Sequence, residues 1–404
     1  MTDAAADPAN VEPEPLVRPP RLNTGRDGNA SRLELFFDLA YVLVVLELAS
    51  AFVADFTGHG LLVITGLFIA VWFSWVGFTL YANRFDTDDV VFRVAKLLAT
   101  ASIAGCAASA SDAVGSYAVP FAGCYLAGRL ILLGLYLRAW RHVSDARDTI
   151  RIYLLAVGVS AAIWAVSLLL PGNLRYLAWA IAVLVDALGP LLVTRGDDRL
   201  PLTIEHLPER FGLLVILVLG EAVGGAVRGV HDAGWATSSV LIAAVGFVIA
   251  AAMWWSYFDT GGRASAEELE EETEDEQGEP EVDQRHDLFI YGHLPLTFGV
   301  VLAGIGIEEL ALHPDDTLPS KYGWLLALGI VVFLAGVAML LGGTLRTWRS
   351  VWPWPLAAIP AVVIIAVLPL PGGLAQVALF AVLLVGLAVR GTLQQRSDST
   401  LTGS

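Results

Sequence analysis

Apolar residues occupy long blocks along this chain, and short polar segments separate them. Each block has roughly the 17–23 residues that a helix needs to cross the hydrocarbon layer of a membrane. Blocks such as 61–80 and 152–170 are apolar on nearly every helical face, whereas a water-soluble helix keeps a polar stripe. The pattern predicts an all-α polytopic membrane protein with about 12 transmembrane helices. We expect them near residues 34–53, 60–82, 92–110, 116–137, 151–170, 174–193, 211–229, 236–257, 288–308, 322–343, 352–369 and 373–390.

Composition and charge agree with a lipid environment. Hydrophobic residues make up 56% of the 404 residues and charged residues only 16%. Much of the formal net charge of −16 is concentrated in one segment, 264–287, which has no apolar face and predicts an acidic, disordered cytoplasmic loop. The Lys and Arg residues are scattered rather than clustered, so we expect no nucleic-acid partner.

The distribution of Lys and Arg predicts the orientation in the membrane. Twenty of the 24 basic residues fall in the N-terminal tail and in alternate loops or at their edges, where they include Lys96. Three others, Arg175, Arg228 and Lys321, fall on the opposite side, and Arg129 lies within a span. By the positive-inside rule, this bias predicts a protein of the cytoplasmic (inner) membrane with both termini in the cytoplasm.

The second half of the chain resembles the first. Residues 126–140 match residues 334–348 at nine of fifteen positions, and Phe-Asp-Thr at 85–87 recurs at 258–260. We therefore expect two tandem six-helix repeats in parallel orientation, at 32–200 and 201–393. Cytoplasmic tails at 1–31 and 394–404 flank them, and the first has the composition of a disordered segment without the apolar core of a signal peptide.

Several ionisable residues lie within predicted spans, where each needs a partner, a cavity or a function. Glu47 and Glu221 are 174 residues apart, so they are candidate repeat equivalents that could face each other and bind a cation, a proton or an organic cation. Arg129 interrupts the symmetry and needs a counter-ion, for which Asp186, Glu47 and Glu221 are available. A structural ion pair is one interpretation of Arg129, and a substrate site is the other.

Further candidates lie near the expected cytoplasmic ends of the spans. Glu34 and Asp38 open the first span, and Glu209 and Arg210 open the seventh, where acids either stabilise the helix start or gate a substrate or ion. His293 precedes a proline in the ninth span and is either a proton relay or a hydrogen-bonded structural residue.

The sequence leaves several functions open. A secondary transporter or an ion- or proton-coupled permease for a small ion or small molecule fits the repeat and the intramembrane acids. The alternatives are a membrane-embedded enzyme acting on a lipid or isoprenoid and a non-catalytic scaffold or sensor. No His, Cys or carboxylate spacing fits a metal site and no P-loop occurs, so we expect no metal and no cofactor. The sequence does not indicate the oligomeric state.

Four segments give the chain a family resemblance. They are Glu34-Leu-Phe-Phe-Asp-Leu39, Glu209-Arg-Phe-Gly212 with the following Gly220-Glu221, Trp254–Thr260 and Tyr291-Gly-His-Leu-Pro-Leu296. In order and context they resemble the bacterial low temperature requirement A (LtrA) family. The resemblance implies a bacterial cytoplasmic-membrane protein linked to growth in the cold. It implies no biochemical activity for individual residues.

Overall fold

The computed structural model describes residues 16–23, 32–86, 88–194, 207–261, 280–316, 319–344 and 353–402. Within them the fold is all-α, with twelve α-helices in the order of the twelve predicted blocks. The helices are α1 (Arg32–Ala54), α2 (Gly58–Arg84), α3 (Val90–Ser109), α4 (Ala118–His142), α5 (Arg147–Ser167), α6 (Gly172–Thr194), α7 (Leu207–Asp232), α8 (Thr237–Trp255), α10 (Pro280–Leu312), α11 (Lys321–Thr344), α13 (Pro353–Val367) and α14 (Gly373–Thr402).

Ten segments in the described part of the chain are long and apolar enough to cross a membrane. They lie in all the helices except α6 and α13. The apolar part of α13, Ala357–Val367, is shorter than a span, and Pro360 lies inside it. The chain is thus a multi-pass membrane protein, because only lipid can cover so many apolar helical surfaces.

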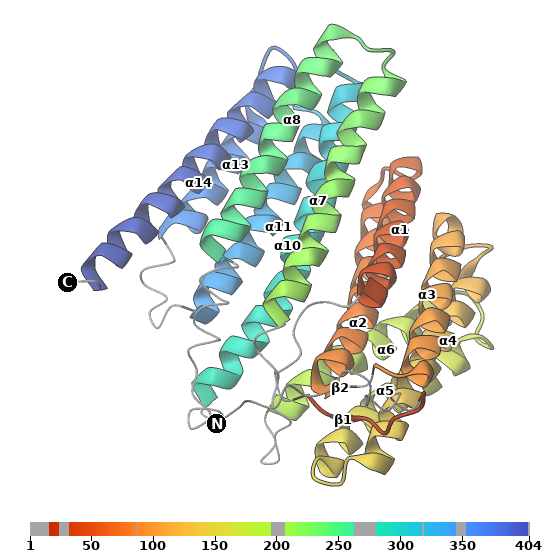
Figure 1. Cartoon of the computed structure of the whole chain (residues 1–404). Coiled ribbons are helices and arrows are strands. Elements are labelled where there is room, and N and C mark those ends of the chain that lie inside the picture. Colours follow the sequence, from red (N-terminus) through yellow and green to blue (C-terminus); the bar gives the residue numbers. More distant parts are fainter. Residues whose placement is uncertain are drawn as a thin grey trace, which may run out of the picture.

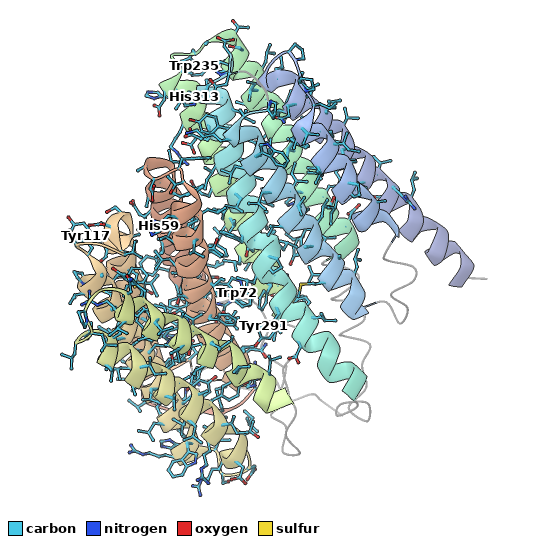
Figure 2. All side chains as sticks on the ribbon, turned by 180° about the vertical axis from the view of Figure 1, so that it is seen from behind. His59, Trp72, Tyr117, Trp235, Tyr291 and His313 are labelled. Carbon is cyan, nitrogen blue, oxygen red and sulfur yellow. The ribbon has the colours of Figure 1, made fainter. Side chains whose placement is uncertain are left out.

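The two halves of the chain form two groups of helices in space. Figure 1 shows α1 to α6, from red to yellow-green, beside α7 to α14, from green to blue. Aromatic rings fill the interface between the groups. Phe68 and Phe298 have ring centroids 4.8 Å apart, and Trp72 lies 6.4 Å from Tyr291 (Figure 2). Any motion of one half against the other must therefore rearrange this layer of side chains.

Helices α10 and α11 approach each other at backbone distance. A Cβ atom added to Gly299 would overlap the backbone nitrogen of Phe333, and one added to Gly329 would overlap the backbone of Ala303. Small residues at such crossings let transmembrane helices gain contact area that lipid tails cannot provide. These two helices consequently form the most tightly joined pair of the second half.

Part of the N-terminal tail is ordered, contrary to the expectation of disorder throughout residues 1–31. Residues 16–23, here called the N-terminal segment, contain strand β1 (Arg21–Leu22), which pairs antiparallel with β2 (Phe85–Asp86). The carboxylate of Asp89 accepts hydrogen bonds from Arg138, at 2.6 Å and 3.0 Å, and from the backbone N–H of Arg18 at 3.1 Å. The pairing of β1 with β2 and the hydrogen bonds to the Asp89 carboxylate explain why residues 16–23 are ordered. Amino-acid composition alone predicts neither of these contacts.

Asp89 also caps α3, because its side chain accepts a hydrogen bond from the Phe92 N–H. Burial works to raise the pKa of Asp89. The hydrogen bonds from Arg138, Phe92 and Arg18 outweigh burial, so the pKa lies below its usual range. The Asp89 carboxylate is thus charged in the folded protein near neutral pH.

Two helix ends differ from the sequence predictions. Helix α10 begins at Pro280, so residues 280–287 are helical although we expected them in the acidic loop. Most of that loop lies outside the described residues. Helix α14 continues to Thr402, through most of the expected tail at 394–404, because no proline or glycine breaks the helix after Thr392.

Candidate functional site

Charged side chains from both halves meet near the starts of α1 and α7. The Arg210 guanidinium of α7 forms an ion pair with Glu34 of α1, and its Nη2 atom lies 3.5 Å from Oδ1 of Asp38. Glu34 and Asp38 are four residues apart, so they lie on one face of α1. Glu34, Asp38 and Arg210 are therefore together, which accounts for three of the four charged residues expected at the cytoplasmic ends of these two spans. The fourth, Glu209, is exposed and makes no ion pair among the described residues.

Asp38 is fully buried and only partly hydrogen-bonded. The indole Nε1 of Trp75, from α2, donates a 2.8 Å hydrogen bond to Oδ1 of Asp38. The other carboxylate oxygen, Oδ2, is enclosed by the protein and has no hydrogen-bond partner among the residues that the structure describes. The Trp75 ring also packs edge-on against Phe211 of α7, with centroids 4.9 Å apart. A side chain of the second half thus supports the group that holds Asp38.

Lys96 is the functional candidate that the sequence analysis missed. The charge pattern groups it with the basic residues at the loop edges, but it lies inside α3 with no exposed surface. Its ammonium Nζ is 3.8 Å from the ring centroid of Phe37 and 5.3 Å from that of Phe78. No hydrogen-bond partner reaches it among the described residues. Its position within a run that is otherwise apolar from Val94 was the available signal.

We call Glu34, Asp38, Trp75, Lys96 and Arg210 the inter-half cluster. Several of its buried polar atoms have no hydrogen-bond partner among the described residues, namely Oδ2 of Asp38, Nζ of Lys96 and both Nε and Nη2 of Arg210, although Nη2 is within ion-pair distance of Asp38. Each such atom costs about 1–3 kcal/mol, and more if the group is charged. A buried acid and a buried amine with unused bonding capacity form a place where a proton can be held and released.

A second buried cluster lies within the first half. The counter-ion of Arg129 is Asp186, with 2.8 Å between Nη2 and Oδ2 and exposed side-chain fractions of 2% and 4%. Nη2 of Arg129 also donates to the hydroxyl of Tyr125, which donates in turn to the backbone oxygen of Ala70 at 2.9 Å. These contacts join α2, α4 and α6. This geometry favours the structural interpretation of Arg129.

Glu47 and Glu221 are not joined to each other by a hydrogen bond or ion pair in the described part of the chain. Glu221 pairs with Arg228 of its own helix at 2.7 Å. The same guanidinium binds Glu308 of α10 at 2.9 Å. Glu47 is half-buried and makes no ion pair with any described residue. The expected site of two facing carboxylates therefore remains a hypothesis without a contact to support it.

His293 has the geometry of a hydrogen-bonded core residue. It is fully buried, and its Nδ1 lies 2.7 Å from the backbone oxygen of Phe289, which can only accept. Nδ1 is thus the protonated nitrogen, so Nε2 accepts from the hydroxyl of Tyr257 at 2.9 Å. Phe211 covers the ring at a centroid distance of 4.5 Å. With both nitrogens bonded, the neutral ring is satisfied.

The described residues enclose a small cavity in the first half and a surface groove in the second. The cavity, of about 140 Å³, lies where α1, α2 and the 3₁₀-helix η2 (Ala110–Asp112) meet, and the groove lies between α8 and α14. Neither Glu47 nor Glu221 lines them. In the described ranges no group of three His, Cys, Asp or Glu side chains is placed to hold a metal ion.

Comparison with known proteins identifies the family. Residues 29–389 match the model of the bacterial low temperature requirement A protein (LtrA). An uncharacterized protein of Rhizobium meliloti (strain 1021), RA0937, is 28% identical over 320 residues, which cover 76% of each chain. No solved structure matches. Since the family model covers most of the sequence, including the residues of the inter-half cluster, the chain belongs to the LtrA family.

Proposed function

We propose that this LtrA protein is a proton-coupled secondary transporter whose proton site is the inter-half cluster. The observation that carries the proposal is the burial of Asp38, Lys96 and Arg210, with unused bonding capacity, where the two halves meet. Ionisable groups inside a membrane domain are costly to bury, and they commonly mark ion and proton pathways. The proposal retains the transport function inferred from the sequence and moves its centre from Glu47 and Glu221 to Asp38.

The two halves are structural repeats in this proposal, and one packing motif supports that. The 174-residue offset between Glu47 and Glu221 also relates Phe37 to Phe211, since 37 + 174 = 211. Lys96, from the third helix of the first half, covers Phe37, and His293, from the third helix of the second half, covers Phe211. A buried base therefore sits on the same phenylalanine in each half, as an internal duplication would produce.

Protonation is coupled to the separation of the halves through Arg210. Its guanidinium binds two carboxylates of α1, and it belongs to α7. A proton on Asp38 removes one of the two negative charges that hold Arg210, and so weakens the link between the halves at this end. The other contact lies at the far end of α1 from this cluster. There Phe56, just after α1, packs against Tyr322 and the ammonium of Lys321, at the start of α11. Alternate opening of these two contacts would give alternating access.

The orientation follows from the charge bias. We place the N-terminal segment and the inter-half cluster on the cytoplasmic side, with the Phe56 contact on the opposite side, because most basic residues lie with the former. Both termini are then cytoplasmic. A proton would bind from the opposite side, where it is driven inward by the membrane potential and pH gradient.

Proton flux in liposomes tests the proposal. Purified protein is reconstituted with an internal pH-sensitive dye, and K⁺, Na⁺, organic cations, amino acids and small carboxylates are added in turn under an imposed pH gradient. We expect one class of solute to change the rate of proton movement. Asp38→Asn should abolish this response, whereas Asp148→Asn, at an exposed position at the start of α5, should retain it.

Infrared difference spectroscopy supplies a readout that needs no substrate. A pH jump on the wild-type protein should show a carboxylic acid band that is absent from Asp38→Asn. If Asp38→Asn transported protons at the wild-type rate, Asp38 would have no place in the mechanism. If folded wild-type protein moved no proton with any of these solutes, a scaffold function would explain the buried ion pairs better.

A further inference from the structure

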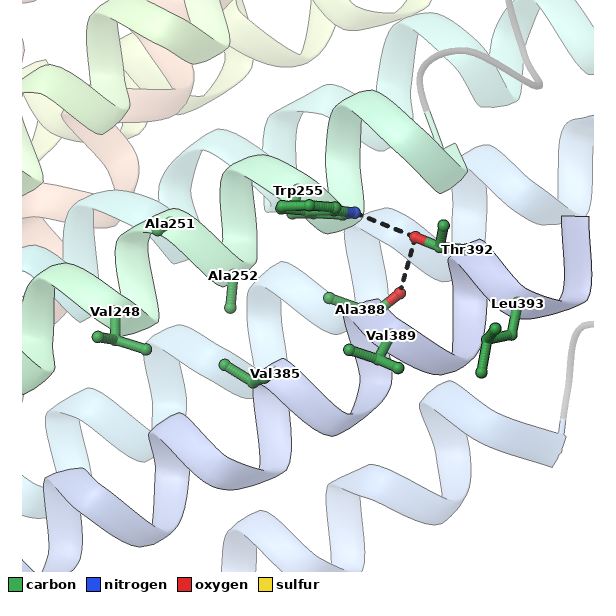
Figure 3. A pocket seen from close by; sticks show the side chains of 9 residues that line it. All are labelled: Val248, Ala251, Ala252, Trp255, Val385, Ala388, Val389, Thr392 and Leu393. Atoms are coloured by element: carbon green, nitrogen blue, oxygen red, sulfur yellow. Dashed lines mark hydrogen bonds between the residues drawn. The ribbon is translucent and has the colours of Figure 1, made fainter. Parts of the chain in front are cut away.

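An apolar groove of about 300 Å³ runs between α8 and α14 on the surface of the second half (Figure 3). All of its lining residues lie within the two candidate membrane spans Thr237–Asp259 and Gly373–Leu393. Val248 and Val385 line one end, and the small side chain of Ala251 leaves the groove open. An apolar surface at this depth faces hydrocarbon, so the chemistry of its occupant is that of a lipid chain.

The other end of the groove is polar. Trp255 donates from Nε1 to the hydroxyl oxygen of Thr392 at 3.0 Å, and that hydroxyl lies 3.2 Å from the backbone oxygen of Ala388 (Figure 3). The same hydroxyl lies 3.1 Å from Oδ2 of Asp259. No Lys, Arg or His in the described part of the chain pairs with the Asp259 carboxylate. The carboxylate of Asp259 thus lies next to the Thr392 hydroxyl that lines this end of the groove, at the boundary of a membrane span, and pairs with no cation among the described residues.

The backbone explains why an acid is placed there. Residues Ser256–Gly261 form a π-helical turn, η4, that follows α8. The wider turn lets Tyr257 point inward to His293, while Asp259 reaches outward to Thr392. Turns of this kind are frequent at functional sites, because they present side chains that a regular helix would direct elsewhere.

We infer that this groove binds one acyl chain of a membrane lipid whose headgroup carries a primary ammonium, such as phosphatidylethanolamine. The ammonium pairs with Asp259, and the chain lies along α8 from Trp255 to Val248, over about 10 Å of helix. Charge selects the headgroup, because a carboxylate attracts an ammonium and repels an anionic lipid. Trp255 lies at the headgroup level that tryptophan prefers. The inference does not depend on transport.

Native mass spectrometry of the full-length protein in detergent tests this assignment. The protein is incubated with phosphatidylethanolamine and phosphatidylglycerol of the same acyl chains, and the bound adducts are compared. We expect several-fold more phosphatidylethanolamine than phosphatidylglycerol on the wild type. Asp259→Asn should remove the preference while lipid still binds. Ala251→Trp should block binding of both, whereas Ala180→Trp, at an exposed alanine of α6, should leave the adducts unchanged.

Three outcomes would overturn the inference. Equal retention of the two lipids by the wild type would show that Asp259 does not select an ammonium. Adducts on Ala251→Trp at the wild-type level would place the lipid elsewhere. A wild-type dimer that dissociates in Ala251→Trp would identify a second copy of the chain, rather than lipid, as the occupant of the groove.

Discussion

Truncation of Asp186 to alanine should destabilise the protein strongly, because it leaves the Arg129 guanidinium buried without its counter-ion. At the 2.8 Å separation of the two charged atoms, Coulomb attraction at an effective dielectric constant of about 20 amounts to about 6 kcal/mol. Desolvation of both charges offsets part of that attraction while the pair is intact. Removing one partner keeps the desolvation cost of the other, so we expect a loss of about 3–5 kcal/mol.

The measurement is reversible unfolding in mixed micelles of increasing SDS content, followed by tryptophan fluorescence. Asp88→Ala is the control, because the Arg93–Asp88 pair has the same 2.8 Å separation but side chains that are 57% and 60% exposed, respectively. We expect that control to cost less than about 1 kcal/mol. The double variant Arg129→Leu/Asp186→Leu should recover most of the loss. Equal costs for Asp186→Ala and Asp88→Ala would refute the reasoning.

Three further predictions concern other parts of the molecule. Because hydrogen bonds lower the pKa of Asp89, its contribution to the stability of the folded protein is complete above about pH 4 and is lost as the pH falls through the lowered pKa. A spin label in the N-terminal segment should therefore become mobile at that low pH, and in Asp89→Asn it should be mobile at every pH. Gly299→Ala should cost about 1–3 kcal/mol in the SDS assay through overpacking, whereas Gly66→Ala, which meets nothing within 4 Å, should be neutral or slightly stabilising. Tyr257→Phe should cost about 1–3 kcal/mol by leaving Nε2 of His293 unsatisfied, and a stability equal to wild type would show that the hydroxyl is dispensable.

The helices could be predicted from the sequence because lipid imposes a strong pattern. Every buried backbone group must bond within its own helix, so long apolar blocks recur along the chain, and ten of them are long enough to span a membrane in the described residues. The partner of Arg129 could not be chosen in this way. Three acids were available, and only the packing of α4 against α5 and α6 brings Asp186 to it. A residue pair between helices depends on neighbours that periodicity does not specify.

The candidate site was only partly predictable. A sequence match between the two halves predicts which residues correspond but not whether they touch, and no hydrogen bond or ion pair joins Glu47 to Glu221 in the described part of the chain. Arg228 follows Glu221 by seven residues, which places both on one helical face, so the sequence contained this ion pair. Lys96 was missed because positive charge near a span end was assigned to a loop. The Phe37 ring that accommodates it comes from another helix.

The N-terminal segment imposes an order on biogenesis. Its anchor, Arg138, lies 120 residues farther along the chain than its partner Arg18. During synthesis the segment can pair with β2 and Asp89 once the start of α3 has been made, but its hydrogen bond from Arg138 forms only after α4 has left the ribosome and entered the membrane. Complete docking of the segment therefore requires that the first four helices have assembled. A tag that blocks this docking would affect the folding of the protein only after α4 has been synthesised.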